Sequence, residues 1–422
     1  MSATGLSFHA YDFLTGHYLT DVPIKGVQFG RLLDGVGSLT GTVNLDDPRV
    51  QRTNVIGATV PDRSVIVADW KNIPVWHGVS KPRKWDVDSS SSGTTGVLSL
   101  SYSSIWSYFQ QRVQATDYSS PPYSGIATFP STMPLWTQTP WFAPLIAAQV
   151  VEDALTVAFG NPLGGMTVTL NGEVPNPQFG HEVSEADYVA VNYPYPSLQN
   201  VESIVTSLAQ LGLGVGFDHA VAVVYRESGS PLGGLTGRFE IDWPWRGAPG
   251  DPASLDPRWE LDLARARKYS FPEDGSQTGN TVYEVGGGGA IWVEQNVAPL
   301  EQGYPLLERV VSRSSIQSPK IMSLLQLNAH SDLALYSYAP TTPTVTIGIE
   351  DSMVQLGLFE VGDLMRLKLA KGIDPRFPEG LDQTWRLTAY NVDARDEGDA
   401  TVLLTFARPP LYLSEVITPG LP

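Results

Sequence analysis

Residues 64–80 have the sequence SVIVADWKNIPVWHGVS, in which two β-rich runs, Ser64–Trp70 and Pro74–Ser80, flank the short segment Lys71-Asn72-Ile73. Runs of β-branched and aromatic residues separated by a short polar segment are typical of a β-hairpin. Apolar and polar residues also alternate over residues 39–45 and 97–102, as they do in half-buried strands. We therefore expect the N-terminal hundred residues to be a strand-rich unit built around this hairpin.

The same succession of segments recurs near the other end of the sequence. Each series consists of a strand, a Trp-bearing strand, a polar loop and a closing strand. The first is Val65–Ala68, Val75–Ser80 with Trp76, the Ser-rich residues 89–96 and Val97–Tyr102; the second is Leu364–Leu369, Thr384–Val392 with Trp385, Asp393–Asp399 and Val402–Phe406. An internal repeat of this kind predicts a duplicated β-barrel. Few residues are identical, so two unrelated β domains are the alternative.

The middle of the chain has helical patterns. Four prolines between residues 114 and 138 predict an irregular arm. Apolar residues at three- and four-residue steps predict helices over Pro140–Phe159 and Ser197–Leu211. Met166–Val174, with Asn171-Gly172 at its centre, predicts a hairpin. The run Gly286–Gly289 is expected to be a flexible connection.

These patterns give the fold class as mainly β, with an α+β middle region and helical and hairpin insertions. Four units are predicted: an N-terminal β-barrel over 1–113, a Pro-rich arm, helix and hairpin over 114–192, an α+β domain over 193–304, and a helix with a C-terminal β-barrel over 305–422. Strands are expected at 343–349, 361–370, 384–392 and 401–407.

Composition narrows the function classes. The 422 residues include 27 Lys and Arg against 44 Asp and Glu, a net charge of −17, which argues against a basic surface that binds nucleic acid. The absence of cysteine excludes disulfides, zinc thiolates and thiol nucleophiles. No long apolar run or basic leader is present, so neither a membrane anchor nor a secretory signal is expected.

Candidate reactive groups are few. Six histidines occur, none spaced as a helical metal-binding pair, so no metal, cofactor or catalytic residue is predicted. Carboxylate pairs such as Asp46-Asp47, Glu260 with Asp262, and Glu350-Asp351 are expected by chance among so many acidic residues. Trp136 and Trp141, in a Pro-rich segment, are the predicted partner contacts, because aromatic residues are enriched at protein interfaces. The alternative is that both are buried beneath the arm.

The order of these elements resembles the tail-tip (baseplate) hub proteins of long-tailed bacteriophages, which are also described as minor tail proteins. The resemblance begins with Gly37–Leu45, Asp47-Pro48, Thr59–Arg63, Val65–Ala68, Pro74–Gly78 and Val97–Tyr102 with Trp106–Phe109. It continues with Leu198–Gly212, Val215–Asp218, Asn280–Val282, Pro305–Glu308, Leu324–Ala329 and Gly362-Asp363 followed by Leu364–Leu369. Residues 114–192 depart from it. The order of the motifs carries the resemblance, because each is short.

The resemblance implies a structural protein of the virion tail tip. It would be a homotrimer whose two tail-tube-like barrels per chain form a pseudo-six-fold ring. Such a ring continues the tail tube, binds the distal tail protein and the tape-measure protein, and carries tail fibre or other minor tail proteins. The resemblance implies no enzyme activity, no cofactor and no specific nucleic-acid binding, although DNA passes through the lumen. Carboxylates there would repel DNA phosphates.

Two other functions stay open from the sequence. One is a neighbouring tail part, either a distal tail ring protein or a receptor-binding protein, which would form six copies instead of three. The other is a cell-wall-degrading enzyme that uses a pair of carboxylates, whose separation the sequence does not give.

Overall fold

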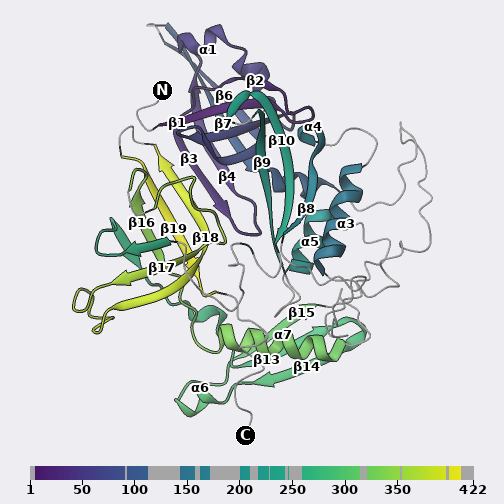
Figure 1. The fold of residues 1–422 in the computed structure, drawn as a ribbon, viewed down its shortest axis with the longest axis vertical. Helices are drawn as coiled ribbons and strands as arrows, with labels where there is room; N and C mark the ends of the chain where they lie inside the picture. Colours follow the sequence, from purple (N-terminus) through teal and green to yellow (C-terminus); the bar gives the residue numbers. More distant parts are fainter. Residues whose placement is uncertain are drawn as a thin grey trace, which may run out of the picture.

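The computed structural model describes residues 5–90, 93–112, 143–156, 162–171, 200–209, 217–227, 229–242, 246, 259–313, 321–351, 354–395 and 399–409. These residues form one 13-stranded sheet and two three-stranded sheets, with helices at the sides (Figure 1). The protein is therefore mostly β, as predicted.

The N-terminal half contributes seven strands to the large sheet. They are β1 (Leu6–Asp12), β2 (Tyr18–Asp21), β3 (Lys25–Leu32), β4 (Ser38–Asn44), β5 (Ser64–Trp70), β6 (Ile73–Ser90) and β7 (Gly93–Ser104), with helices α1 (Pro48–Arg52), α2 (Val55–Ala58) and the 3-10 helix η1 (Ile105–Gln111). The predicted hairpin is confirmed: β5 pairs antiparallel with β6. Lys71 and Asn72 form its turn with φ of 49° and 68°, the backbone that a tight hairpin turn requires.

The C-terminal half contributes six strands to the same sheet. They are β11 (Trp259–Asp262), β12 (Lys268–Ser270), β16 (Thr344–Gly348), β17 (Leu364–Leu369), β18 (Leu381–Ala394) and β19 (Thr401–Ala407), with the 3-10 helix η5 (Gly275–Gln277). The four C-terminal strands expected from the sequence are thus confirmed as β16 to β19.

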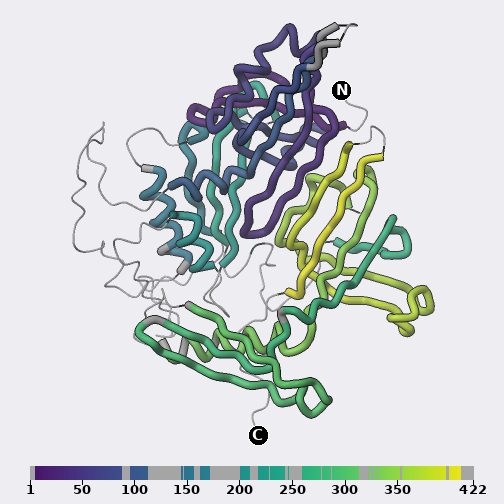
Figure 2. The backbone as a smooth tube through the Cα atoms, turned by 180° about the vertical axis from the view of Figure 1, so that it is seen from behind, coloured from purple at the N-terminus to yellow at the C-terminus, as the bar shows by residue number. Residues whose placement is uncertain are grey.

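The two halves meet where β18 pairs antiparallel with β3, which makes their strands one sheet. In Figure 2 the C-terminal strands lie directly beside the N-terminal ones. A single buried apolar cluster extends through both halves, from Phe29 and Leu39 to Val392 and Phe406. Residues far apart in the sequence therefore share one core.

The two halves repeat the same three-stranded meander. β5 pairs with β6 and β6 with β7, and in the same way β17 pairs with β18 and β18 with β19. The middle strand bulges at the same place: residues 80–83 of β6 oppose 100–102 of β7, and residues 387–390 of β18 oppose 404–406 of β19. A shared bulge sets a common register for the two meanders.

That register corrects one detail of the sequence comparison. Counted from the bulge, Trp385 corresponds to Gly78 and not to Trp76. A Cβ at Gly78 would lie 2.3 Å from the Trp76 ring, so the indole of Trp76 lies over this glycine. Trp76 thus lies two residues before the position that matches Trp385. Because alternate residues share a face of a strand, both indole rings lie on the same face, over equivalent positions.

The middle unit is α+β and packs on the N-terminal half. It contains α3 (Ala143–Thr156), α4 (Pro162–Gly165), β8 (Thr167–Asn171), α5 (Val201–Ala209), β9 (Asp218–Glu227) and β10 (Ser230–Asp242). The predicted helices are confirmed as α3 and α5. β8 pairs parallel with β10, and the return strand of the predicted 166–174 hairpin lies outside the described residues. A second apolar core joins these elements to β1, β5 and η1.

A third sheet lies at the far end of the molecule. It consists of β13 (Thr281–Gly286), β14 (Ile291–Gln295) and β15 (Glu308–Arg313), with the 3-10 helix η6 (Gly287–Gly289), the helix α6 (Ala298–Glu301) and the helix α7 (Ile321–Tyr336) lying along it (Figure 1). The expectation of a flexible link at Gly286–Gly289 is wrong: these residues form the tight turn between β13 and β14, because Gly288 and Gly289 adopt positive φ. None of the described helices is long and apolar enough to span a membrane.

Candidate functional site

Among the described residues, the carboxylate pairs singled out in the sequence do not come together as a site. Trp136 and Trp141 lie outside the described residues. The carboxylate pairs are spread over the surface. Asp47 caps α1 by accepting a hydrogen bond from the Arg49 backbone N–H, and Glu260 forms an ion pair of 2.7 Å with Lys368.

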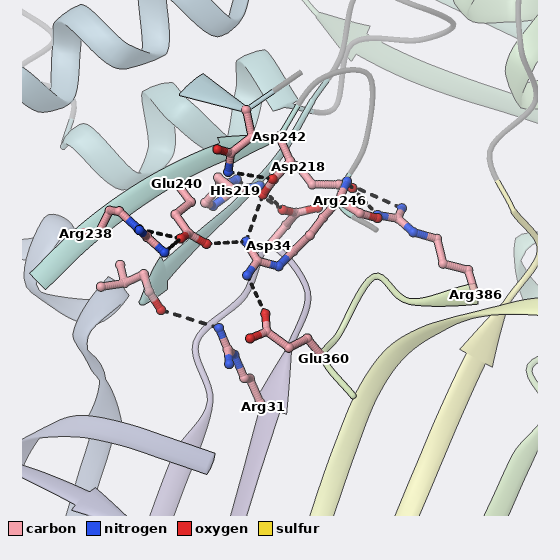
Figure 3. Close-up of polar contacts among 12 residues, drawn as sticks. Arg31, Asp34, Asp218, His219, Arg238, Glu240, Asp242, Arg246, Glu360 and Arg386 are labelled. Atoms are coloured by element: carbon pink, nitrogen blue, oxygen red, sulfur yellow. Dashed lines mark hydrogen bonds and ion pairs between the residues drawn. The ribbon is translucent and has the colours of Figure 1, made fainter. Parts of the chain in front are cut away.

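A different set of charged residues converges where the two halves of the large sheet meet the β9–β10 hairpin (Figure 3). We refer to this set as the junction cluster. It consists of the carboxylates Asp34, Asp218, Glu240, Asp242 and Glu360, the guanidinium groups Arg31, Arg238, Arg246 and Arg386, and His219. Charged side chains are rarely buried unless they are paired, so each contact here is informative.

One link joins Arg386 of β18 to Asp218 at the start of β9. The Arg386 guanidinium pairs with the Asp218 carboxylate, and the two side chains are only 7% and 10% exposed. Arg386 also donates to the backbone carbonyls of Gly362 and Arg246. The C-terminal half is therefore attached to the middle unit by a buried ion pair, and Arg386 makes further hydrogen bonds beside it.

Arg246 makes a second link between the same two parts. Its Nη1 lies 2.8 Å from both Glu240 Oε2 and Asp242 Oδ2, while its Nη2 pairs with Glu360, which precedes β17. Burial alone would raise the pKa of Glu360, but Arg31 and Arg246 nearby hold it below its ordinary value. One guanidinium thus bridges β10 and the C-terminal half.

Asp34 joins the N-terminal half to the same junction cluster. It follows β3 with φ of 53°, a left-handed conformation that Asp tolerates. Its Oδ1 accepts a hydrogen bond of 2.7 Å from the backbone N–H of His219. Desolvation, and then the neighbouring Asp218 carboxylate, raise the pKa of Asp34 well above its ordinary value. This environment therefore favours the protonated form of Asp34 more than water does.

The imidazole of His219 lies among aromatic rings. Its centroid is 4.5 Å from the Trp106 ring and 6.0 Å from the Phe239 ring. Burial lowers the pKa of His219 to about 4, so the ring is neutral at physiological pH. Nearby His77 is also buried, and its pKa falls to about 3 for the same reason, with a smaller contribution from Arg31.

The space between these groups is small. A cavity of about 30 Å³, lined by Arg31, Trp76, His77, Trp106 and His219 among others, adjoins the junction cluster. This volume fits about one water molecule and no organic substrate. Among the described residues, the contacts of the junction cluster join β3, β9, β10 and β18.

A second polar contact fixes the other end of the β9–β10 hairpin. Tyr225 of β9 donates a 2.7 Å hydrogen bond to Asp69 of β5 within the buried interior. His9 of β1 lies 3.6 Å from the same carboxylate. The hairpin is thus tied to the N-terminal half near both of its ends.

Sequence reasoning missed the junction cluster, although a weak signal was present. Asp218 and His219 interrupt an otherwise apolar stretch, and Arg386 stands between Trp385 and Leu387 in a strand. Charges in such places indicate a buried partner. The identity of that partner is not local, because Asp218 and Arg386 are 168 positions apart.

Comparison with solved structures decides the fold. The tail protein from Neisseria meningitidis MC58 superposes with a TM-score of 0.56 at 13% identity, covering 96% of this chain and 97% of that one. The chain has the fold of a phage tail protein. The 43 kDa tail protein of prophage MuSo2 from Shewanella oneidensis gives a TM-score of 0.52 at 10% identity, covering 96% and 98%. No protein-family model and no curated protein sequence matches this chain.

Breaking the Asp218–Arg386 pair should destabilise this tail-protein fold strongly. We expect Arg386→Met or Asp218→Asn to lower the free energy of unfolding by about 3–5 kcal/mol, because each leaves a buried charge without its partner. The double variant Asp218→Asn with Arg386→Met should cost less than the sum of these two single variants. Denaturant unfolding measures all three. The control Arg366→Met removes an exposed pair with Asp382 and should change stability far less; equal losses would contradict the role given to the buried pair.

His219 should make stability depend on pH. Its folded pKa of about 4 lies below the ordinary value of 6.5, so its contribution is complete above pH 6.5 and is lost as the pH falls through 4. The loss is about 3 kcal/mol for a shift of this size. We expect His219→Phe to reduce the fall in the free energy of unfolding between pH 6.5 and 4, measured by denaturant titration at each pH, while buried His77 contributes the part that stays. His17→Phe replaces an exposed imidazole and serves as the control; parallel curves for wild type and His219→Phe would refute the assignment.

Proposed function

We propose that this protein is the structural hub of a phage tail tip. In this proposal each half of the chain is a tail-tube-like β-barrel, three copies form a ring with pseudo-six-fold symmetry, and the ring joins the tail tube and distal tail protein to tape-measure and fibre proteins. The observation that carries the proposal is the repeated meander with its shared bulge, in a chain that has a tail-protein fold over nearly its whole length.

The repeat supports a hub because it lets an assembly of three chains match a tail tube with six-fold symmetry. A trimer of single-barrel chains offers three similar faces, whereas a trimer of duplicated chains offers six. For this to work the two halves must keep a fixed relative orientation. The β3–β18 ladder and the junction cluster both connect the halves, directly or through β9 and β10. The net charge of −17 supports a lumen that does not retain DNA.

We propose further that the protein is not an enzyme. Glu260 and Asp262 line a surface hollow of about 430 Å³ together with Lys368 and Asp382. Glu260 is neutralised by Lys368, and hydrogen bonds from Arg366 hold the pKa of Asp382 below its ordinary value. A glycosidase acid needs a carboxyl group whose pKa is raised. These pairs favour a structural role for the hollow.

The stoichiometry tests the hub. Native mass spectrometry of the purified full chain should give a species of three copies, because the duplicated halves then supply six similar faces. A six-copy species would favour the distal tail ring, and a chain that stays monomeric at all concentrations would contradict the proposal.

The non-enzymatic assignment has its own test. On zymograms containing host cell wall, the intact chain should produce no clearing, and Glu260→Gln with Asp262→Asn should behave like the parent. Clearing by the parent that is lost in this variant would overturn the assignment.

A further inference from the structure

The strand β18 has two different neighbours along one edge. Its first part, from Leu381 to Arg386, pairs with β17, and its second part, from Ala389 to Ala394, pairs with β3. β19 occupies the other edge. The second part of β18 is therefore covered on both sides, and Val392 and Ala394 are 0% and 8% exposed.

The corresponding part of β6 lacks that second neighbour. Its residues 73–79 pair with β5, and residues 83–90 pair with β7 on the other edge. No strand in the described part of the chain lies beside residues 83–90 on the β5 side. The shared bulge assigns the correspondence: Arg83 matches Tyr390, Trp85 matches Val392 and Val87 matches Ala394.

The exposed side chains along this open edge include two large apolar ones, of the kind that a neighbouring strand usually covers. Trp85 is 42% exposed and Val87 is 63% exposed, although the residues they match in β18 are buried. Two apolar side chains on the same face of a strand gain stability when a neighbouring strand covers them. The edge also carries Lys81, Pro82 and Lys84, which disfavour indiscriminate strand pairing. These features indicate a specific partner strand.

The repeat identifies a strand with the matching free edge. β12 lies beside β16 as β3 lies beside β4. Following the residue pairs from β19 through β16 to β12, and from β7 through β4 to β3, matches Tyr269 with Val27 and Phe271 with Phe29. Among the described residues β12 pairs with β16 alone. β12 thus offers the edge that β3 uses to pair with β18.

We propose that residues 83–87 of β6 pair antiparallel with β12 and the residues after it, 268–273, of a second copy of this chain. Transferring the β3–β18 register places Trp85 opposite Phe271 and Val87 opposite Tyr269. Within one chain the strands β16, β19, β18, β3, β4 and β7 separate β12 from β6, so the partner is another copy. The proposal deepens the ring of the proposed function and depends on it.

The chemistry of the two edges is complementary at this register. The aromatic and β-branched pairs Trp85–Phe271 and Val87–Tyr269 fall on one face, and such cross-strand pairs stabilise a sheet. On the same face Arg83 lies opposite the exposed Glu273, an opposite-charge pair. On the other face Asp86 lies opposite Ser270 and diagonal to the exposed Lys268. No like charges face each other directly in this arrangement.

The absence of native cysteine allows a direct test of the register. The double variant Asp86→Cys with Ser270→Cys should form disulfide-linked dimers and trimers on oxidation, seen on non-reducing gels and removed by reductant. The matched control, Asp86→Cys with Tyr269→Cys, places the second thiol on the opposite face of the strand. Its cross-linking should be at least tenfold weaker, as should that of each single variant.

A second variant tests the surface without introducing thiols. Trp85→Asp puts a carboxylate opposite Phe271 and should raise the concentration at which native mass spectrometry shows half assembly by at least tenfold. Val224→Asp, at an exposed position on β9, is the matched control and should leave assembly unchanged. Circular dichroism of both variants confirms that each is folded.

The outcomes separate this inference from the proposed function. Three-copy assembly without selective Asp86–Ser270 cross-linking, or equal cross-linking in the control, overturns the strand pairing and leaves the trimeric hub standing. Chains that stay monomeric overturn both. Three-copy assembly with selective cross-linking, and its loss in Trp85→Asp, supports both.

Discussion

The ion pair between Asp218 and Arg386 is the constraint on which the arrangement of the middle unit and the C-terminal half depends. Transferring two charges from water to a protein interior costs several kcal/mol per ion, and only close pairing with further hydrogen bonds offsets that cost. The pair joins β9 to β18, and the carbonyls of Gly362 and Arg246 accept the remaining Arg386 donors. A displacement of the C-terminal half against the β9–β10 hairpin would leave a charge buried and unpaired. The pair therefore acts on orientation more than on net stability.

The duplicated meander explains why such a constraint is useful. A sheet alone does not fix orientation closely, since the twist angle between neighbouring strands varies over a range of about 25°. The β3–β18 ladder alone would leave the two halves free to vary within that range. Arg246 adds ion pairs to Glu240 of β10 and to Glu360, and Asp34, which follows β3, adds a hydrogen bond to β9. Backbone pairing and charge pairing together hold the two similar halves in one relative orientation.

The features that the sequence predicted correctly are those with local causes. The turn chemistry of Lys71 and Asn72 produced the β5–β6 hairpin, and the apolar stripe of α5 produced a helix. The β3–β18 pairing and the junction cluster depend on residues more than 100 positions apart, whose choice of partner leaves no periodic pattern. The sequence comparison matched Trp76 with Trp385 because both are tryptophan. In the structure Trp385 matches Gly78, and the Trp76 ring lies over that glycine, which sequence alone does not show. For Gly286–Gly289, composition indicated flexibility where positive φ at two glycines gives a defined turn.

The pairing of β3 with β18 also governs the order of events during synthesis. Leu32 and its partner Ala389 are 357 residues apart in the chain. At translation rates of about 5–20 residues per second, the β3 edge waits on the order of 20–70 seconds for its neighbour to emerge from the ribosome. An exposed strand edge can recruit foreign strands during that interval. Nascent and truncated chains that lack β18 therefore carry this edge uncovered, and only the completed polypeptide covers it.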